Sequence, residues 1–314
     1  NPQSPIPNPQ SPIPIFYSVD NILYLIYTNI NNSIILYDLM VEKKKCEIKK
    51  AHEQCITSFR HYLDNINKKD LLISISAQEN NIKLWNLNKC ECLLNIYNGR
   101  ACYLYSACFL NDNIKLYILV SNFTYALGMP IKLYNLEGKV IKEIKDSSDR
   151  VFFIDTYYDK KSSNYFIITG NQGYVKSYNY NQNELYHKYS DNNINGHPSI
   201  VINDKDRIIK LIESCWDKNI RIWDFHSGDL LNKIKINDEL SSLCLWDNDH
   251  LFVGCRDKTI KIVDIKNNLI INSLLGHDNN IATIKKINHP KYGECLLSQG
   301  YKEGNIKLWI MHKS

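Results

Sequence analysis

The 314-residue chain is 44% hydrophobic, and its 38 Lys and Arg against 33 Asp and Glu give a net charge of +5. This composition is typical of a globular protein and excludes a disordered chain. The mildly basic charge permits an acidic partner but lacks the dense basic face of a dedicated nucleic-acid-binding domain. The densest basic runs lie at residues 43–45 and 49–50, and we interpret them as the solvated positions of a charge-protected edge strand.

Residues 1–14 are two tandem copies of NPQSPIP and hold six of the nine prolines. Such a segment is expected to be extended and similar to polyproline II. We favour a linker or an edge strand over an SH3-domain ligand, because no Arg flanks the PxxP spacing. The sequence does not begin with Met, so we also expect that the chain is a domain of a longer protein.

From residue 15 onward one pattern recurs: a turn, followed by the strand-like run apolar-x-apolar-aromatic-Asp/Asn. In the copy SCWDKNIRIWDF at 214–225, Ile220 and Ile222 alternate with Arg221, as in a strand with one buried face. A repeat of about 40–45 residues built from short strands is typical of a propeller blade. Seven copies occur at intervals of 40 to 49 residues, and their anchor residues are Tyr37, Trp85, Tyr134, Tyr178, Trp223, Val263 and Trp309.

Each repeat has room for further strands around its anchor strand. In the sixth repeat, strand-like segments at 240–246 and 250–255 precede the anchor strand, and a fourth segment follows at 269–275. We expect polarity to rise toward the fourth strand, because the first strand packs against neighbouring blades while the fourth faces water.

The repeats resemble the WD40 repeat in three features: Gly276-His277 ahead of a first strand, an Asp-containing tight turn, and Trp223-Asp224 closing the third strand. The resemblance covers about residues 15–314. It implies an all-β fold, a single seven-bladed WD40 β-propeller of four-stranded antiparallel blades. The last repeat lacks a fourth strand of its own, and we expect residues within 1–14 to supply it. Proline is tolerated in such a strand because only one of its edges is paired.

In WD40 proteins a His, a Ser or Thr, the turn Asp and the Trp form a structural hydrogen-bonded network. The resemblance therefore implies scaffold roles for these residues, with irregular middle blades where they are missing. In the fifth repeat, Glu213 stands where a small hydroxyl residue is common. Copies of the network are expected from His52, Ser74 or Ser76, Glu79 and Trp85 in the second repeat, and from His277, Ser298, Glu303 and Trp309 in the seventh.

No catalytic motif is present. The sequence has no nucleophile elbow, Walker loop, zinc-protease motif or dinucleotide-binding glycine motif. Its nine histidines show no metal-ligand spacing, and its ten cysteines include no Cys-x-x-Cys pair. We therefore predict a non-enzyme without cofactor or metal. Many cysteines sit in apolar segments as small buried hydrophobes, which fits a reducing, cytoplasmic compartment, with a nuclear location also open. No signal peptide or bilayer-spanning apolar run occurs.

The surface remains as the candidate site. If the family geometry applies, the residue before each turn acid lies on the top face of the propeller. An exposed Trp216 beside basic residues would form an aromatic-basic patch typical of binding hot spots, whereas the alternative is that Trp216 packs on a neighbouring loop. The predicted partner-binding residues are Gln78, Trp216, Arg256 and Lys302, with Arg100 and Arg150 extending the patch.

The sequence thus predicts a non-enzymatic scaffold for protein–protein interaction that binds partner segments on the top face, within a multi-protein complex. Two alternatives stay open. In the first, the chain is a targeting domain of a larger enzyme or assembly. In the second, it binds anionic ligands (nucleic acid or phosphoinositide) through the lysines of 43–50 and the arginines. Nucleic acid is the less favoured partner, and the identity of the partner is not predicted.

Overall fold

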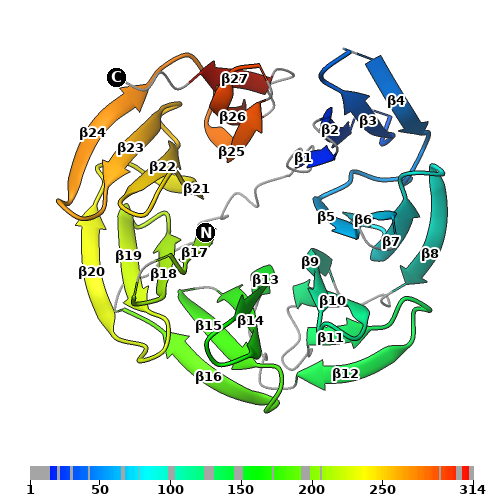
Figure 1. The fold of residues 1–314 in the computed structure, drawn as a ribbon, viewed down its shortest axis with the longest axis horizontal. Helices are drawn as coiled ribbons and strands as arrows, with labels where there is room; N and C mark the ends of the chain where they lie inside the picture. The colour runs from blue at the N-terminus through cyan, green and yellow to red at the C-terminus, as the bar shows by residue number, and fades with distance from the viewer. Residues whose placement is uncertain are drawn as a thin grey trace, which may run out of the picture. The chain divides into compact units, whose positions relative to one another are not determined.

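The computed structural model describes residues 15–19, 22–28, 31–41, 43–64, 68–76, 78–97, 103–123, 131–144, 151–171, 173–191, 199–205, 207–289, 291–301 and 306–310. These residues form 27 β-strands arranged as seven antiparallel sheets, the blades (Figure 1). The fold is therefore the all-β, seven-bladed propeller that the repeat spacing predicts. The part of the chain that the structure describes contains no helix long and apolar enough to cross a membrane.

The first compact unit holds blades one to three. In each of these blades the strands pair in chain order, so the first and fourth strands form the two edges of the sheet. Blade one consists of β1 (Ile15–Val19), β2 (Ile22–Thr28), β3 (Ile34–Asp38) and β4 (Lys43–Ile48); blade two of β5 (Ser58–Asp64), β6 (Lys69–Ser76), β7 (Asn81–Asn86) and β8 (Glu91–Tyr97); blade three of β9 (Tyr103–Asn111), β10 (Leu116–Phe123), β11 (Ile131–Tyr134) and β12 (Val140–Ile144).

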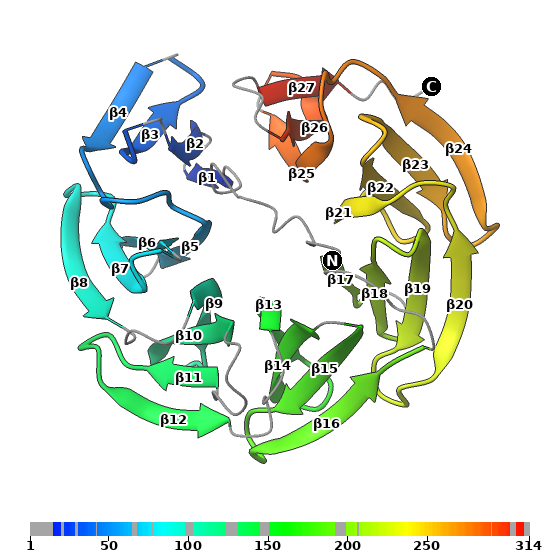
Figure 2. The same cartoon turned by 180° about the vertical axis from the view of Figure 1, so that it is seen from behind.

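The second unit holds blades four to seven (Figure 2). Blade four consists of β13 (Val151–Asp159), β14 (Asn164–Asn171), β15 (Tyr174–Asn179) and β16 (Glu184–Tyr189); blade five of β17 (Ser199–Asn203), β18 (Lys210–Ser214), β19 (Asn219–Asp224) and β20 (Leu230–Lys235). Blade six consists of β21 (Leu240–Leu245), β22 (His250–Cys255), β23 (Ile260–Asp264) and β24 (Leu269–Leu274); blade seven of β25 (Ile281–His289), β26 (Gly293–Gly300) and β27 (Ile306–Ile310).

Blade seven has three strands in the described part of the chain. The expectation that a segment within 1–14 supplies its fourth strand lies outside the described residues. Leu308 and Ile310 of β27 are 39% and 41% exposed. The equivalent Ile222 of blade five, which a fourth strand covers, is 4% exposed. The apolar side chains of β27 thus remain accessible at the edge of the described sheet.

Apolar side chains from consecutive blades interlock to form the cores. In the first unit, Ile26 and Leu36 of blade one cluster with Trp85 of blade two. In the second unit, Ile222 of blade five clusters with Val253 of blade six. Because buried apolar area drives association of the sheets, consecutive blades within each unit stabilise one another.

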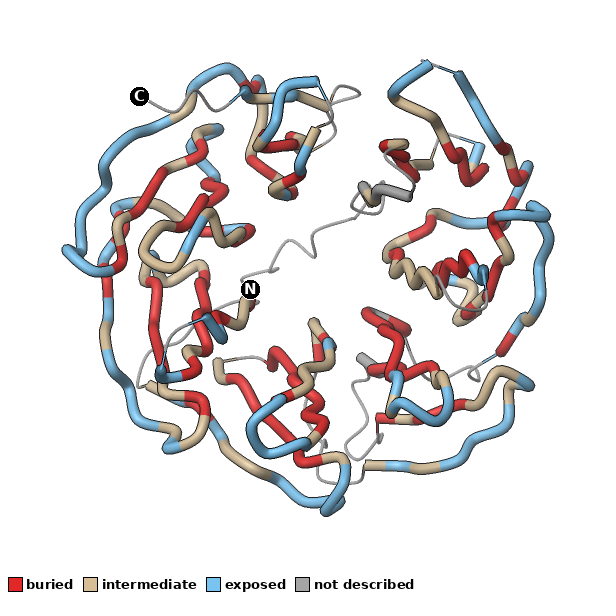
Figure 3. The backbone as a smooth tube through the Cα atoms, viewed as in Figure 1, coloured by how far each residue is buried: buried red, intermediate tan, exposed pale blue. Residues whose placement is uncertain are grey.

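In the six blades with four described strands, the fourth strand is largely exposed, as expected (Figure 3). The β24 strand departs from the expected rise in polarity, because it is almost entirely exposed although it carries no charged residue. Leu269, Ile270 and Ile271 are 57%, 43% and 49% exposed. As the fourth strand of its blade, β24 has its side chains and one hydrogen-bonding edge open to solvent. The position of the strand in the blade, and not its residue types, therefore determines how exposed these side chains are.

A register shift precedes the anchor residue in five blades. At this point the fourth strand has one residue more than the third, which shifts the register between the two strands. Such a β-bulge also increases the local twist. The shifts lie between Leu36 and Tyr37, Leu84 and Trp85, Ser177 and Tyr178, Ile222 and Trp223, and Ile262 and Val263. The repeated anchor in the sequence therefore marks a repeated irregularity of the backbone.

The cysteines only partly follow the expectation of small buried hydrophobes. Cys108, Cys215, Cys255 and Cys295 are buried free thiols, as expected. Cys46 of β4 and Cys90 in the β7–β8 turn instead form a disulfide with Cα atoms 6.3 Å apart, which corrects the expectation for this pair. The two residues are 44 positions apart in the sequence, and folding brings the edge of blade one beside that turn.

Candidate partner-binding surface

Two blades contain the hydrogen-bonded network expected from the repeats. In blade two, Trp85 Nε1 donates to Ser74 Oγ at 2.7 Å, and His52 Nε2 lies 2.7 Å from the same oxygen. His52 Nδ1 lies 3.1 Å from Glu79 Oε2. Ser74 and not Ser76 is therefore the hydroxyl residue of this network. Burial lowers the pKa of His52 to about 4, with Glu79 opposing the shift, so the imidazole is neutral at pH 7.

Blade seven repeats the arrangement around Ser298. Its Oγ lies 2.6 Å from His277 Nε2 and accepts from Trp309 Nε1 at 2.7 Å. Glu303, the expected fourth member, lies outside the described residues. In both blades a central hydroxyl satisfies the buried polar atoms of two rings, so these residues hold the blade together.

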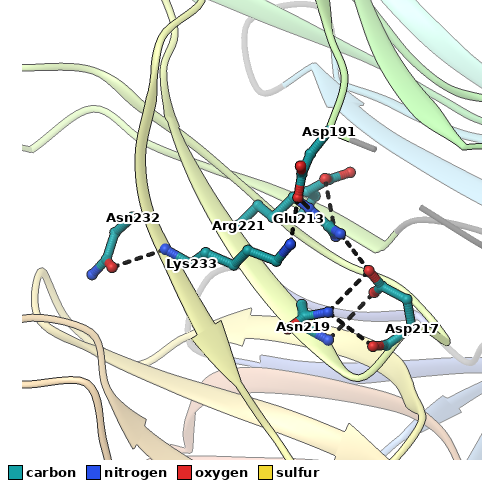
Figure 4. A network of polar contacts seen from close by, with 7 residues as sticks. All are labelled: Asp191, Glu213, Asp217, Asn219, Arg221, Asn232 and Lys233. Atoms are coloured by element: carbon teal, nitrogen blue, oxygen red, sulfur yellow. Dashed lines mark hydrogen bonds and ion pairs between the residues drawn. The ribbon is translucent and has the colours of Figure 1, made fainter. Parts of the chain in front are cut away.

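Blade five replaces this network with charged groups (Figure 4). Glu213 pairs with Arg221 in the register where Ser74 pairs with Lys83 in blade two, so a carboxyl group occupies the hydroxyl position. Arg221 is fully buried, with 0% of its side chain exposed. Three carboxylates and one ammonium complete what we name the Arg221 cluster: Asp191, Glu213, Asp217, Arg221 and Lys233.

The guanidinium of Arg221 contacts each carboxylate through a different nitrogen. Nε donates to Asp191 Oδ2 at 2.9 Å, Nη2 donates to Asp217 Oδ2, and Nη1 lies 3.7 Å from Glu213 Oε1. Lys233 Nζ donates to the same oxygen of Asp191 at 2.6 Å. Hydrogen bonds from Lys233 and Arg221 hold the pKa of Asp191 below its usual range. Buried Arg221 thus ties β19 to the segment before β17 and to the β18–β19 turn.

That turn carries Trp216, the central residue of the predicted patch. Lys218 adopts a positive φ of 68° and its N–H donates to Cys215 O at 3.3 Å. Asp217, which faces the Arg221 cluster, also accepts from Asn219 N at 3.3 Å. Trp216 is half-buried. The exposure of Trp216 is thus intermediate between the two expectations, an exposed side chain and one packed on a neighbouring loop. Its role in binding stays a prediction.

Arg256 occupies the equivalent β22–β23 turn of blade six, in which Lys258 has a φ of 74°. The loop 236–239, between β20 and β21, bridges the two turns. Ile236 N donates to Lys218 O at 2.8 Å, and Arg256 N donates to Glu239 O at 2.9 Å. The structure therefore brings the turns of Trp216 and Arg256 to one end of adjacent blades. We name residues 215–218, 236–239 and 256–258 the turn surface.

The turn surface carries both signs of charge. Arg256 Nη1 donates to Glu239 Oε2 at 2.5 Å, and both side chains remain partly exposed. Asp257 Oδ2 accepts from Lys261 Nζ at 2.6 Å. Lys218 and Lys258 add exposed positive charge. A partner would therefore contact paired charges around Trp216. The acidic residues of the loop 236–239 were not among the residues predicted from the sequence.

The remaining predicted residues lie either in the first unit or outside the described residues. Gln78 is exposed in the β6–β7 turn of blade two, in the first unit. Arg100, Arg150 and Lys302 lie outside the described residues. Their role in binding stays a prediction.

One group of residues has donors at metal-binding separation. The ligand atoms of Asp238, Cys255 and Asp257 lie within 4.8 Å of one another. However, Asp257 already contacts the ammonium of Lys261, and Asp238 Oδ2 accepts from Asp257 N at 2.7 Å. Since the lysine supplies the positive charge that a metal would bring, these residues do not imply a metal site.

Comparison with known proteins finds partial similarity to several relatives, whereas no family model matches the chain. It is 24% identical over 149 residues to the U3 small nucleolar RNA-associated protein 21 homolog of Schizosaccharomyces pombe, covering 46% of this chain and 16% of that protein. It is 27% identical over 103 residues to the ribosome biogenesis protein WDR12 homolog of Culex quinquefasciatus, covering 32% and 24%. The chain is a seven-bladed β-propeller whose repeats are consistent with the WD40 family.

Another relative of this propeller is named for an enzyme. Myosin heavy chain kinase C of Dictyostelium discoideum is 29% identical over 68 residues, which cover 22% of this chain and 9% of the kinase. The matched segments span at most 24% of the length of these three relatives. The similarity therefore concerns a repeat-containing part of each relative and does not transfer the activity of the whole protein.

Proposed function

We propose that this propeller is a non-enzymatic interaction scaffold that binds a segment of a protein partner at the turn surface. Support comes first from the fold and from relatives named for ribosome biogenesis and nucleolar RNA association. Propellers of this kind present loops on a rigid support, which suits recognition of other proteins. The relatives' names favour work within a larger assembly, with a nuclear location beside the cytoplasmic one.

The observation that carries the proposal is the bridging of two blades around Trp216. The loop 236–239 hydrogen-bonds to both turns, and the Arg221 cluster fixes the turn of Trp216 from beneath. A half-buried indole on a fixed turn can contact a partner at little cost in conformational entropy. Trp and Arg are enriched among residues that dominate binding energy, and the mixed charges nearby can select a partner with a complementary pattern.

A second candidate, the binding of an anionic ligand through the lysines of β4, receives less support. Lys43, Lys44 and Lys45 are exposed. However, Lys44 pairs with Glu47, and Lys45 Nζ lies 4.2 Å from the ring centroid of Tyr24. Two of the three charges thus have partners within blade one. Affinity for a polyanion that falls steeply with salt would favour this candidate over protein binding.

The double variant Trp216→Ala/Arg256→Glu is expected to weaken capture of the native partner by ~30-fold or more, since a hot-spot residue contributes about 2 kcal/mol. The measurement is quantitative affinity capture from the source cell, with mass spectrometry, followed by titration of the captured protein. Thermal unfolding of the variant should match that of the wild type, because both residues lie on the surface.

A matched control changes an exposed aromatic and a basic residue at the other end of the strands. Tyr292→Ala/Lys266→Glu alters the β25–β26 and β23–β24 turns, which lie opposite the turn surface along their strands. Capture should be unaffected in this control. If both double variants retain the same partners at the same affinity, the turn surface is not the binding site.

A further inference from the structure

The Arg221 cluster has an uneven charge balance that gives one of its members a special role. Arg221 and Lys233 carry two positive charges, whereas Asp191, Glu213 and Asp217 would carry three negative charges if all were ionised. One proton on a carboxyl group makes the cluster neutral. Since an uncompensated charge is costly inside a protein, that proton is expected on the carboxyl group with the least support for its ionised form.

Glu213 is that group. Its side chain is 0% exposed, and among the described residues neither carboxyl oxygen has a hydrogen bond of good geometry, so that the nearby indole of Trp223 supports the ionised form only weakly. Asp191 and Asp217, in contrast, each accept a charged hydrogen bond from Arg221. Burial raises the pKa of Glu213 from 4.5 to about 7, although Arg221 opposes the shift. The proton is therefore exchanged in the physiological range.

The strands packed around Glu213 add no other charge to balance it. On β17 the residue opposite Glu213 in register is Ile200, and β21 of blade six, which contacts β18, has no charged residue. On β19 the facing groups are Arg221 and the uncharged Trp223. The charged groups near Glu213 in the described structure are thus Asp191, Asp217 and Arg221 of the cluster, and the titratable thiol of Cys215 nearby stays uncharged because burial raises its pKa.

Loss of the proton would change the contact that holds the turn of Trp216. An ionised Glu213 would draw the guanidinium toward itself through Nη1, which lies 3.7 Å away and has no hydrogen-bond partner among the described residues, and so would draw Nη2 away from Asp217. Asp217 follows Trp216 directly, and Lys218 of the same turn accepts the hydrogen bond from the loop 236–239. A weaker bond between Asp217 and Arg221 would therefore loosen the part of the turn surface that carries the indole.

We infer that Glu213 is a buried proton switch for the turn surface: its protonated form keeps Arg221 on Asp217, and its ionised form releases the turn and weakens partner binding. This inference rests on the proposed function in naming partner binding as the affected activity. The native state holds the proton more tightly than the unfolded chain does, so stability should also fall as pH rises from about 4.5 to about 7.

Hydrogen exchange of the full chain tests the switch without a partner. Between about pH 6 and about pH 8, protection factors of the amides in 215–219, corrected for intrinsic exchange, should fall by ~10-fold in the wild type. Glu213→Gln, which cannot ionise, should keep its protection constant. Glu184→Gln, which removes an exposed carboxylate of β16 outside the turn surface, should behave as the wild type does. Constant protection in the wild type, or an equal fall in Glu213→Gln, would overturn the inference.

A direct titration covers the case in which Glu213→Gln does not fold. Carbon-13 NMR of the wild-type protein labelled at the Glu carboxyl carbon should show one buried carboxyl with a midpoint near 7, whereas a highest midpoint below about 5 would overturn the switch. These measurements need no partner. They can therefore disprove the proton switch independently of partner binding. Partner binding at the turn surface is tested separately by affinity capture with the Trp216→Ala/Arg256→Glu variant.

Discussion

Replacement of Arg221 by methionine is expected to lower the free energy of unfolding by ~3–5 kcal/mol, because it leaves three carboxyl groups around an uncharged side chain. Arg221 has no exposed side-chain surface, and it contacts Asp191, Glu213 and Asp217 through different nitrogens. The loss can be measured by urea unfolding at neutral pH. Because the contacts join β19 to the β18–β19 turn, hydrogen exchange should rise first in blade five.

The neighbouring cation provides the control for this prediction. Lys233 is 39% exposed on its side chain and contacts Asp191 alone within the cluster. Lys233→Met should therefore cost no more than about 1 kcal/mol, as for partly exposed ion pairs. A loss for Arg221→Met no larger than that for Lys233→Met would contradict the view that Arg221 organises the cluster. In a double-mutant cycle, Glu213→Gln should be coupled to Arg221→Met, since their side chains are neighbours.

A second large loss, about 3 kcal/mol, is expected for Asp70→Ala in the first unit, because the change removes two hydrogen bonds to a buried carboxylate. Asp70 is 5% exposed. Its Oδ1 lies 2.7 Å from His61 Nε2, and its Oδ2 accepts from Tyr17 Oη at 2.9 Å. The rings of Tyr17 and His61 also contact each other in a tilted arrangement, with centroids 3.8 Å apart. These contacts join β1 of blade one to β5 and β6 of blade two.

Two milder variants separate the hydrogen bonds from the cavity that the alanine change creates. Asp70→Asn keeps the size of the side chain, and Tyr17→Phe removes one donor, so each should cost about 1–2 kcal/mol. Urea unfolding of the three variants gives the comparison. A change for Asp70→Ala within about 0.5 kcal/mol of the wild type would show that this triad does not stabilise the first unit.

The fold was predictable because the same local signal occurs seven times. Anchors such as Trp85 and Trp223 recur at blade spacing, and β7 alternates as expected, whereas β19 corrects the expectation of one buried face because Arg221 is buried as well. The prediction of increasing polarity failed at β24, because it relied on residue type. Leu269 and its neighbours are exposed through their position at the blade edge, which composition does not indicate.

The candidate site was predictable only in part. Trp216 and Arg256 occupy equivalent turns, so repeat alignment could place both on one face. The loop 236–239 carries no repeat signal, and its contacts with Lys218 and Arg256 depend on the packing of two blades. Glu213 was visible in the sequence because it replaces the hydroxyl residue that is common at this repeat position. Asp191 gave no such signal, because it lies at the start of an Asn-rich segment without periodicity. The pairing of Cys46 with Cys90 likewise depends on tertiary contacts.

The central claim, that a partner binds at the turn surface, is tested most directly by site-specific photo-crosslinking in the source cell. A photoreactive phenylalanine analogue is placed at Trp216 in one sample and at the exposed Tyr292, at the opposite end of the strands, in the other. The account predicts a discrete protein adduct from position 216 that is absent at position 292. Adducts of equal yield and identity from both positions, or an adduct from position 292 alone, would contradict it.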